Sequence, residues 1–263
     1  MAKQQKISEM EQRRQFRAEQ MQKAKEAKRK QNRILLLAIA VAVLIAGAVA
    51  TVIFLIPNST EIPAISMDDL DFTEANIEDY IPNGAESDHV LINVSYTDKN
   101  GAEKKGDILV RLYDEVAPGT VENFKNMVKK GIYTNSTFHR VVKDFMIQGG
   151  QKNKDNAQEV KPIVGEFTSN GFTNNLLHKR GVISMARSND PNSATSDFFI
   201  MHKDSTSLDG KYASFGYVGA GMDIVDEIAE VEVKANAGMN GEISAPVNTV
   251  TINNVQFAMY IGE

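Results

Sequence analysis

The sequence predicts a mainly β domain, a closed antiparallel barrel capped by two helices, in the part of the chain that follows residue 88. Short apolar runs separated by turn residues recur there up to residue 257. Only two segments carry apolar residues at helical spacing. About 175 residues with many strands and few helices favour a barrel, because closure removes the exposed edges of a sheet.

The strands are expected to begin with a hairpin that joins residues 90–96 to residues 108–112. Apolar residues recur at every second position in both segments. Asn100-Gly101 lies between them and is expected to supply the positive φ angles of a tight turn. Further apolar runs predict strands at 138–147, 181–186, 197–201, 213–218 and 247–257.

Two helices are expected to complete the domain. The first is predicted to start at Pro118, since proline fits the first turn of a helix, and to place Val121 and Phe124 on one apolar face. Gly131 is expected to end it, because glycine readily adopts the left-handed conformation that follows many helices. A shorter amphipathic helix is predicted around residues 222–229.

Charge divides the chain into three parts. Residues 1–33 carry eleven Lys or Arg and four Asp or Glu, residues 34–56 carry none, and the remainder is acidic enough to make the net charge −5. An acidic main domain repels phosphate backbones, so nucleic acid is not expected as a partner. The chain has no cysteine, which excludes disulfides, thiol catalysis and a cysteine-linked lipid anchor.

Residues 34–56 are 23 uncharged residues, mostly Leu, Ile, Val and Ala. As a helix they would extend roughly 34 Å, enough to cross a bilayer. The run is longer than the apolar core of a cleavable signal peptide, so an uncleaved transmembrane helix is expected. Basic residues crowd its N-terminal flank, which predicts a cytoplasmic N-terminus.

Four parts of the chain follow from these patterns. They are a basic cytoplasmic tail (1–33), a transmembrane helix in contact with membrane lipid (34–56), a flexible acidic linker (57–88) and a globular domain (89–263). The protein is thus predicted to span the cell membrane once, with its globular domain on the extracytoplasmic side. If the charge rule fails, that domain faces the cytoplasm instead.

One segment carries most of the chemical information. Residues 138–150 combine a Phe-His-Arg triplet with the run Phe-Met-Ile-Gln-Gly-Gly. Val-Glu-Asn-Phe precedes it at 121–124, and it is followed by the stretch 181–200 and by Leu-Asp-Gly-Lys at 208–211. Together these segments resemble the signature of the cyclophilin family of peptidyl-prolyl cis/trans isomerases, over about residues 90–257. The resemblance implies eight strands in the barrel.

The resemblance also implies a mechanism. Rotation about an X-Pro bond is opposed by amide resonance, a barrier of about 18–20 kcal/mol, and no covalent bond has to break. Arg140 corresponds to the family residue whose guanidinium hydrogen-bonds the prolyl nitrogen once the bond twists, which stabilises the transition state and not the planar ground state. Gln148 corresponds to the residue that binds the substrate backbone and orients Arg140. Phe145 completes the implied catalytic set.

The remaining site residues implied by the resemblance surround the proline ring and the residues before it. They are Met146, Ala186, the main chain of Arg187, Phe199, Leu208 and Tyr212, with His139 as a structural support. No metal or cofactor is required by this reaction. The expected partners are unfolded polypeptides that contain proline.

Several positions depart from the family pattern, among them Thr195 where Gly is usual. Ser207 stands where the best-known members have Trp, Tyr212 where they have His, and Asp197 where Gln is usual. Because Ser207 removes a large aromatic wall, weak binding of cyclosporin, the family's inhibitor, is expected. Tyr212 can still pack against the proline ring.

The predicted function is acceleration of X-Pro rotation in unfolded or folding proteins outside the membrane. The alternative is a non-catalytic module with the same fold that binds proline-containing segments as a chaperone or scaffold. The direct membrane anchor and the absence of cysteine are more similar to a bacterial surface foldase than to an organellar one.

Overall fold

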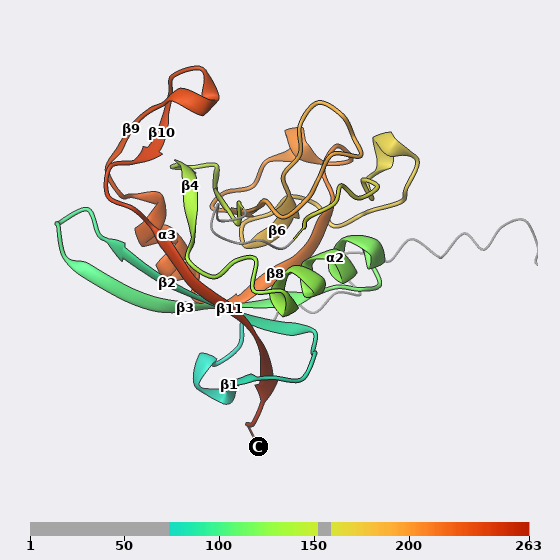
Figure 1. The fold of residues 1–263 in the computed structure, drawn as a ribbon, viewed down its shortest axis with the longest axis horizontal. Helices are drawn as coiled ribbons and strands as arrows, with labels where there is room; N and C mark the ends of the chain where they lie inside the picture. The colour runs from blue at the N-terminus through green and yellow to red at the C-terminus, as the bar shows by residue number, and fades with distance from the viewer. Residues whose placement is uncertain (1–73, 152–158, 263) are drawn as a thin grey trace, which may run out of the picture. The chain divides into compact units, whose positions relative to one another are not determined.

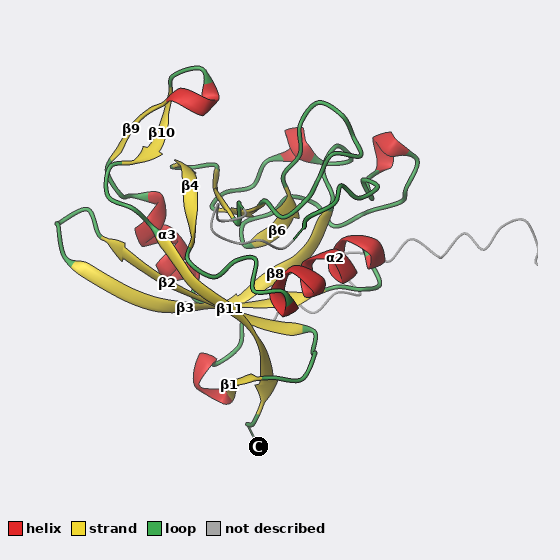
Figure 2. Ribbon diagram, viewed as in Figure 1, coloured by secondary structure: helices red, strands yellow, loops and turns green. Residues whose placement is uncertain are grey.

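The computed structural model describes residues 74–151 and 159–262, which form one β-barrel with two α-helices (Figures 1 and 2). The strands are β1 (Tyr80–Asn83), β2 (His89–Thr97), β3 (Glu103–Leu112), β4 (Ser136–Val142), β5 (Met146–Gly149), β6 (Val182–Met185), β7 (Phe198–Met201), β8 (Ser214–Ala220), β9 (Val233–Asn236), β10 (Glu242–Pro246) and β11 (Thr251–Tyr260). The helices are α2 (Pro118–Lys129) and α3 (Met222–Ala229). Short 3-10 turns occur at Ile77–Asp79, Thr168–Asn170, Thr206–Leu208 and Ala237–Met239.

The main sheet closes on itself, as predicted. Its strand order is β1-β11-β2-β3-β8-β6-β7-β5-β4, and β11 pairs additionally with β4. That pairing, Thr251 with Thr137 and Ile252 with Ser136, joins the eight strands from β11 to β4 into a closed antiparallel ring. β1 lies outside the ring as a ninth strand on β11. The predicted eight-stranded, mainly β barrel with two helices is therefore confirmed.

Aromatic side chains fill the space between α2 and the barrel. The Phe124 ring on α2 lies 5.1 Å from Tyr133, 5.6 Å from Phe198 and 5.2 Å from Phe215, measured between ring centroids. Phe124 and Phe215 are completely buried. Aromatic pairs at this spacing add about 0.5–1.5 kcal/mol each beyond the burial of their area. This packing holds α2 against strands β7 and β8, which carry Phe198 and Phe215.

Both ends of α2 agree with the sequence prediction. Pro118 occupies the first turn, and Gly131, at φ +63°, follows the last. The N-cap residue, Ala117, has no side chain that can accept a hydrogen bond. The buried carboxylate of Glu166 replaces it, accepting from the backbone N–H of Gly119 at 2.9 Å and of Thr120 at 2.7 Å.

Two predicted turns differ in detail. The run 138–147 is two strands, β4 and β5, because Asp144 adopts φ 61° and turns the chain between them. In the first hairpin Gly101 has φ +84°, while Asn100 is not among the residues with positive φ. The Asp98 side chain makes that turn instead, accepting from the N–H of Asn100 and Ala102 at 2.9 and 2.8 Å.

The structure corrects the boundary between linker and domain. Residues 74–88, predicted as part of a flexible linker, belong to the folded domain. β1 pairs with β11 from Tyr80 opposite Tyr260 to Asn83 opposite Phe257. The N–H of Ala75 also donates to the carbonyl of Gly219 at 2.8 Å. The sequence did not predict this segment to be folded because it has few apolar residues. Its backbone hydrogen bonds to the barrel do not depend on side chains.

The predicted tail 1–33, transmembrane helix 34–56 and linker residues 57–73 lie outside the described residues. Within residues 74–151 and 159–262, no helix combines the length and apolar character needed to cross a bilayer.

Candidate active site

The antiparallel pair β4–β5 brings Arg140 and Gln148 directly opposite each other. The Arg140 Nη1 lies 3.4 Å from Gln148 Oε1 and 3.8 Å from the sulfur of Met146. Its guanidinium carbon lies 5.9 Å from the centroid of the Phe145 ring. The chain reverses between these two strands, so four of the predicted site residues meet through local structure alone.

Strand β7 adds the apolar part of the site. Phe199 pairs with Gln148 across β5–β7, and its ring makes an edge contact with Tyr212 at 5.7 Å between centroids. The Arg187 guanidinium lies 4.5 Å from the Tyr212 centroid and donates to the carbonyl of Lys211 at 2.7 Å. Tyr212 is thereby held between an apolar ring and a cation, a favourable arrangement for its π system.

The other predicted substrate-binding residues lie along the same surface. The N–H of Ala186 donates to the carbonyl of Asp197 at 2.9 Å, which fixes the end of β6 beside β7. Leu208, in the turn Thr206–Leu208, is half-buried and packs against the main core. Met146 and Phe199 are almost completely buried, while Phe145 is half-buried. The set therefore combines buried apolar residues with partly accessible ones.

His139 lies beside Gln148. Its Nε2 is 3.5 Å from Gln148 Nε2 and 3.8 Å from Asp197 Oδ2. Burial raises the pKa of the Asp197 carboxyl, and the nearby His139 opposes that shift. His139 thus connects the departure at residue 197 to the predicted substrate-binding Gln148.

A buried polar network supports the apolar residues from behind. His178 Nδ1 lies 3.0 Å from Asp209 Oδ1, and its Nε2 lies 3.1 Å from the hydroxyl of Ser184. The His178 ring stacks on Phe199 at 5.9 Å. An ionised carboxylate only accepts, so Nδ1 carries the proton and Nε2 accepts from Ser184. The sequence did not indicate this network, because the partners of His178 are 6 and 31 residues away.

The most direct partner of Arg140 was not predicted. Glu242, on β10, accepts from Arg140 Nε at 2.6 Å and from Nη2 at 2.8 Å. These hydrogen bonds lower the pKa of Glu242. Neither β10 nor its partner β9 was predicted as a strand, since the segment carries scattered apolar residues and no family motif.

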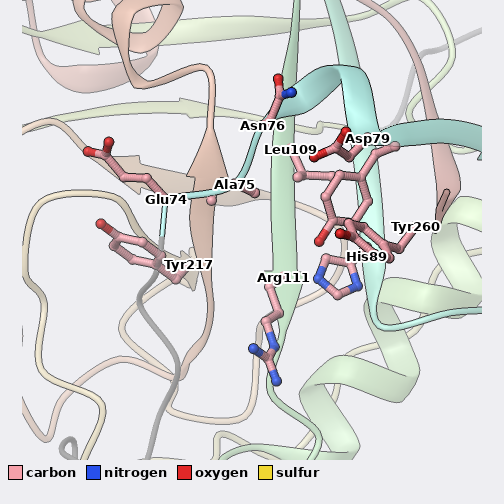
Figure 3. A pocket seen from close by; sticks show the side chains of 11 residues that line it. Glu74, Ala75, Asn76, Asp79, His89, Leu109, Arg111, Tyr217 and Tyr260 are labelled. Atoms are coloured by element: carbon pink, nitrogen blue, oxygen red, sulfur yellow. The ribbon is translucent and has the colours of Figure 1, made fainter. Parts of the chain in front are cut away.

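A pocket is lined by other residues of the domain. It has a volume of about 270 Å³ and is bordered by residues 74–76, 79 and 80 and by residues of β2, β3, β8 and β11 (Figure 3). Figure 3 shows Arg111, His89 and Tyr217 around it. None of the predicted site residues lines this pocket, so it is separate from the candidate active site.

Comparison with known proteins gives the site a context. Residues 96–257 match the family model described as cyclophilin type peptidyl-prolyl cis-trans isomerase/CLD. A peptidyl-prolyl cis-trans isomerase of Acinetobacter baylyi is 40% identical over 174 residues, covering 63% of this chain and 88% of that protein. Peptidyl-prolyl cis-trans isomerase B of Escherichia coli is 36% identical over 163 residues, covering 57% of this chain and 93% of that protein.

A solved structure is also similar. It is a cyclophilin type peptidyl-prolyl cis-trans isomerase of Cryptosporidium parvum, determined in the presence of the dipeptide Ala-Pro. It is 23% identical, with a TM-score of 0.48, and the match covers 63% of this chain and 98% of that chain.

Proposed function

The chain belongs to the cyclophilin-type peptidyl-prolyl cis-trans isomerase family, and we propose that Arg140 is the residue with which it catalyses rotation about X-Pro bonds. The observation that carries this proposal is the position of the guanidinium. Nη1 lies within 3.4 Å of Gln148 Oε1 and beside Met146 and Phe145. A permanently charged donor group beside apolar side chains suits a reaction that twists an amide.

The proposed mechanism uses differential binding. A planar prolyl amide has its nitrogen lone pair delocalised, so that nitrogen is a poor acceptor in the ground state. Twisting localises the lone pair, and Arg140 then donates to it, which stabilises the transition state selectively. Lowering the barrier by about 7 kcal/mol corresponds to about five orders of magnitude in rate.

The substrate is proposed to lie across three groups of residues. The proline ring packs on Phe145, Met146 and Phe199, with Leu208 and Tyr212 at the border. Gln148 binds the substrate backbone, and Ala186 with the main chain of Arg187 contacts the residues before proline. The ring contact at 5.7 Å between Phe199 and Tyr212 supports this division, since it joins the apolar group to its border.

An isomerisation assay on the purified full-length chain tests the role of Arg140. With a proline-containing peptide, Arg140→Ala is expected to lower kcat/KM by about a hundredfold or more, similar to the loss of a hydrogen-bond donor aimed at a transition state. Arg140→Lys is expected to recover little of it, because a lysine has a different length and donor geometry. Thermal unfolding of each variant provides the folding control. Rates equal to wild type would remove Arg140 from the mechanism.

The site of action is a second proposal. We propose that residues 34–56 anchor the chain in the cell membrane, with residues 1–33 in the cytoplasm and the isomerase domain outside. The uncharged run of 23 residues and the basic residues before it support this arrangement. The clients would be unfolded or folding polypeptides that emerge on the outer face of the membrane.

Protease treatment of intact cells tests the orientation. The isomerase domain is expected to be degraded without lysis, while a tag added before residue 1 is expected to survive until the cells are broken. Survival of the domain in intact cells together with loss of the tag would reverse the orientation. Release of the whole chain by carbonate extraction would argue against the anchor.

A further inference from the structure

We propose that Glu242 is a positioning residue for Arg140, presented by a hairpin outside the barrel. The inference rests on the catalytic role proposed for Arg140 and adds a component that lies 102 residues away in sequence. Glu242 accepts two hydrogen bonds from the guanidinium, from Nε at 2.6 Å and from Nη2 at 2.8 Å. Such bidentate pairs fix orientation as well as charge.

The geometry of the pair determines which donors remain for the substrate. Glu242 uses the Nε–H and one Nη2–H of Arg140. The Nη1 group remains on the side of Gln148 and Met146, at 3.4 and 3.8 Å from their side-chain oxygen and sulfur. Because a guanidinium is planar, binding one edge to Glu242 fixes the direction of the opposite edge. Glu242 therefore sets the direction in which the remaining donors of Arg140 face.

The hairpin that carries Glu242 is attached to β4 next to Arg140. Glu242 pairs with Asn236 across β9–β10, and these two strands form a sheet of their own. The side chain of Asn236 donates to the carbonyl of His139 and to the buried hydroxyl of Ser244, each at 3.4 Å. Figure 1 shows the hairpin projecting beside β4. The strand position opposite Glu242 is therefore bonded to the residue that precedes Arg140, which keeps the carboxylate close to the guanidinium.

Burial and charge both favour a stable ion pair between Arg140 and Glu242. The side chain of Arg140 is 15% exposed and that of Glu242 is 36% exposed. Hydrogen bonds from Arg140, reinforced by Ser244, lower the pKa of Glu242, so the carboxylate stays ionised at neutral pH. Partial burial reduces the screening that weakens ion pairs at the surface. Removing Glu242 would remove the hydrogen bonds that restrain Nε and Nη2, so the Arg140 side chain could adopt other rotamers.

A free arginine side chain has considerable rotamer entropy, which the substrate would otherwise have to remove during catalysis. Fixing it in advance favours the transition state, because the hydrogen bond from Arg140 is formed only when the amide is twisted. Loss of Glu242 is therefore expected to reduce turnover and to leave peptide affinity nearly unchanged. Loss of general structure would reduce both.

The test is a double-mutant cycle on the full-length chain. Glu242→Ala is expected to lower kcat about tenfold with KM changed less than twofold, a modest loss for a residue that acts through another. Glu242→Gln is expected to fall between this variant and wild type, since its amide oxygen can still accept one of the two hydrogen bonds. Line-shape NMR with saturating peptide separates turnover from binding. Lys234→Ala, an exposed position on the same hairpin, is the matched control and should retain wild-type turnover.

The decisive comparison uses Arg140→Ala as the background. There, Glu242→Ala is expected to have no further effect on the residual rate, because the residue it positions is gone. An equal fold loss in both backgrounds, or wild-type turnover in Glu242→Ala alone, would overturn the inference. Faster turnover would overturn it too, because Glu242 would then restrain Arg140 unproductively. Wild-type activity of Arg140→Ala itself would instead contradict the proposed function.

Discussion

At the scale of single residues, the candidate site has a buried polar group, His178, behind its apolar residues. His178 has 1% exposure, and both of its ring nitrogens have partners, Asp209 and Ser184. Burial lowers the pKa of His178, although Asp209 partly opposes the shift. A second proton on the ring would break the hydrogen bond from Ser184 and place a charge under Phe199.

The lowered pKa of His178 predicts an acid sensitivity. The unfolded chain takes up this proton near the ordinary imidazole pKa of 6.5, whereas the folded chain takes it up only at lower pH. The free energy of unfolding should therefore decrease as the pH falls through 6.5, by at most about 1.4 kcal/mol per pH unit. Above pH 6.5 His178 should not contribute to the pH dependence of the free energy of unfolding.

Urea unfolding at pH values from 7.5 to 5 measures this effect. His178→Phe keeps a ring next to Phe199 but cannot titrate, so its stability is expected to be lower throughout and less dependent on pH. The difference in slope between the two proteins isolates His178 from carboxylates that titrate nearby. Parallel curves would contradict the assignment.

Ser207 predicts weak binding of cyclosporin. Ser207 is exposed in the turn Thr206–Leu208, and its carbonyl accepts from Lys211 Nζ at 3.0 Å. A tryptophan there would keep this main-chain contact and add an aromatic wall. Burying about 100 Å² of its apolar area contributes about 2.5 kcal/mol. Ser207→Trp is therefore expected to tighten inhibition at least about tenfold, as measured by inhibition of isomerase activity. Nanomolar inhibition of the wild type would refute the prediction.

At the scale of elements, the ends of α2 show how a distant residue completes a helix. Pro118 and Gly131 determine where the helix lies in sequence, but its first N–H groups need an acceptor. Glu166, on a loop 46 residues from Thr120, provides both carboxylate oxygens. A negative charge at this end also interacts favourably with the helix dipole. The loop and the helix therefore stabilise each other.

Glu166→Ala is expected to lower the free energy of unfolding by about 2–3 kcal/mol. The variant loses two hydrogen bonds to a charged acceptor and leaves the buried N–H of Thr120 without this partner. Denaturant unfolding measures the change. Glu159→Ala removes only an exposed carboxylate paired to Lys161 at 3.7 Å and should change stability by less than about 0.5 kcal/mol. Equal effects of the two variants would exclude a capping role.

At the scale of the whole molecule, β1 extends the domain beyond the barrel. β11 is long enough to pair with β4 near Thr251 and with β1 near Tyr260. Ala75, Ile77 and Tyr80 pack against a small apolar cluster outside the main core. Figure 1 places β1 and the hairpin β9–β10 at opposite ends of the structure. This segment therefore affects stability without contacting Arg140.

Two fragments test this conclusion. A chain beginning at residue 74 is expected to be more stable than one beginning at residue 89 by about 2–4 kcal/mol, since β1 adds backbone hydrogen bonds and apolar contacts. Urea unfolding gives the difference. The two fragments should have the same kcat/KM, because β1 lies away from the site. Equal stability would show that β1 does not contribute to the folded domain.

The sequence by itself determined the fold class, both ends of α2 and the group around Arg140. Arg140, Phe145, Met146 and Gln148 span nine residues, and a β-hairpin brings opposite positions together by local geometry. Family resemblance identified these four residues together with Phe199 and Tyr212, which the barrel places beside this hairpin. Local periodicity and short motifs are visible in one sequence because the interactions behind them are local.

Only the tertiary structure decided which distant residues complete these parts. Glu242 reaches Arg140, Glu166 caps α2, and β1 joins β11, each across a separation of more than forty residues. No spacing in the sequence indicates such pairs, because each depends on how the barrel orients two segments relative to each other. A carboxylate at the end of a loop or on a short hairpin resembles any solvated acidic residue until its partner is in place.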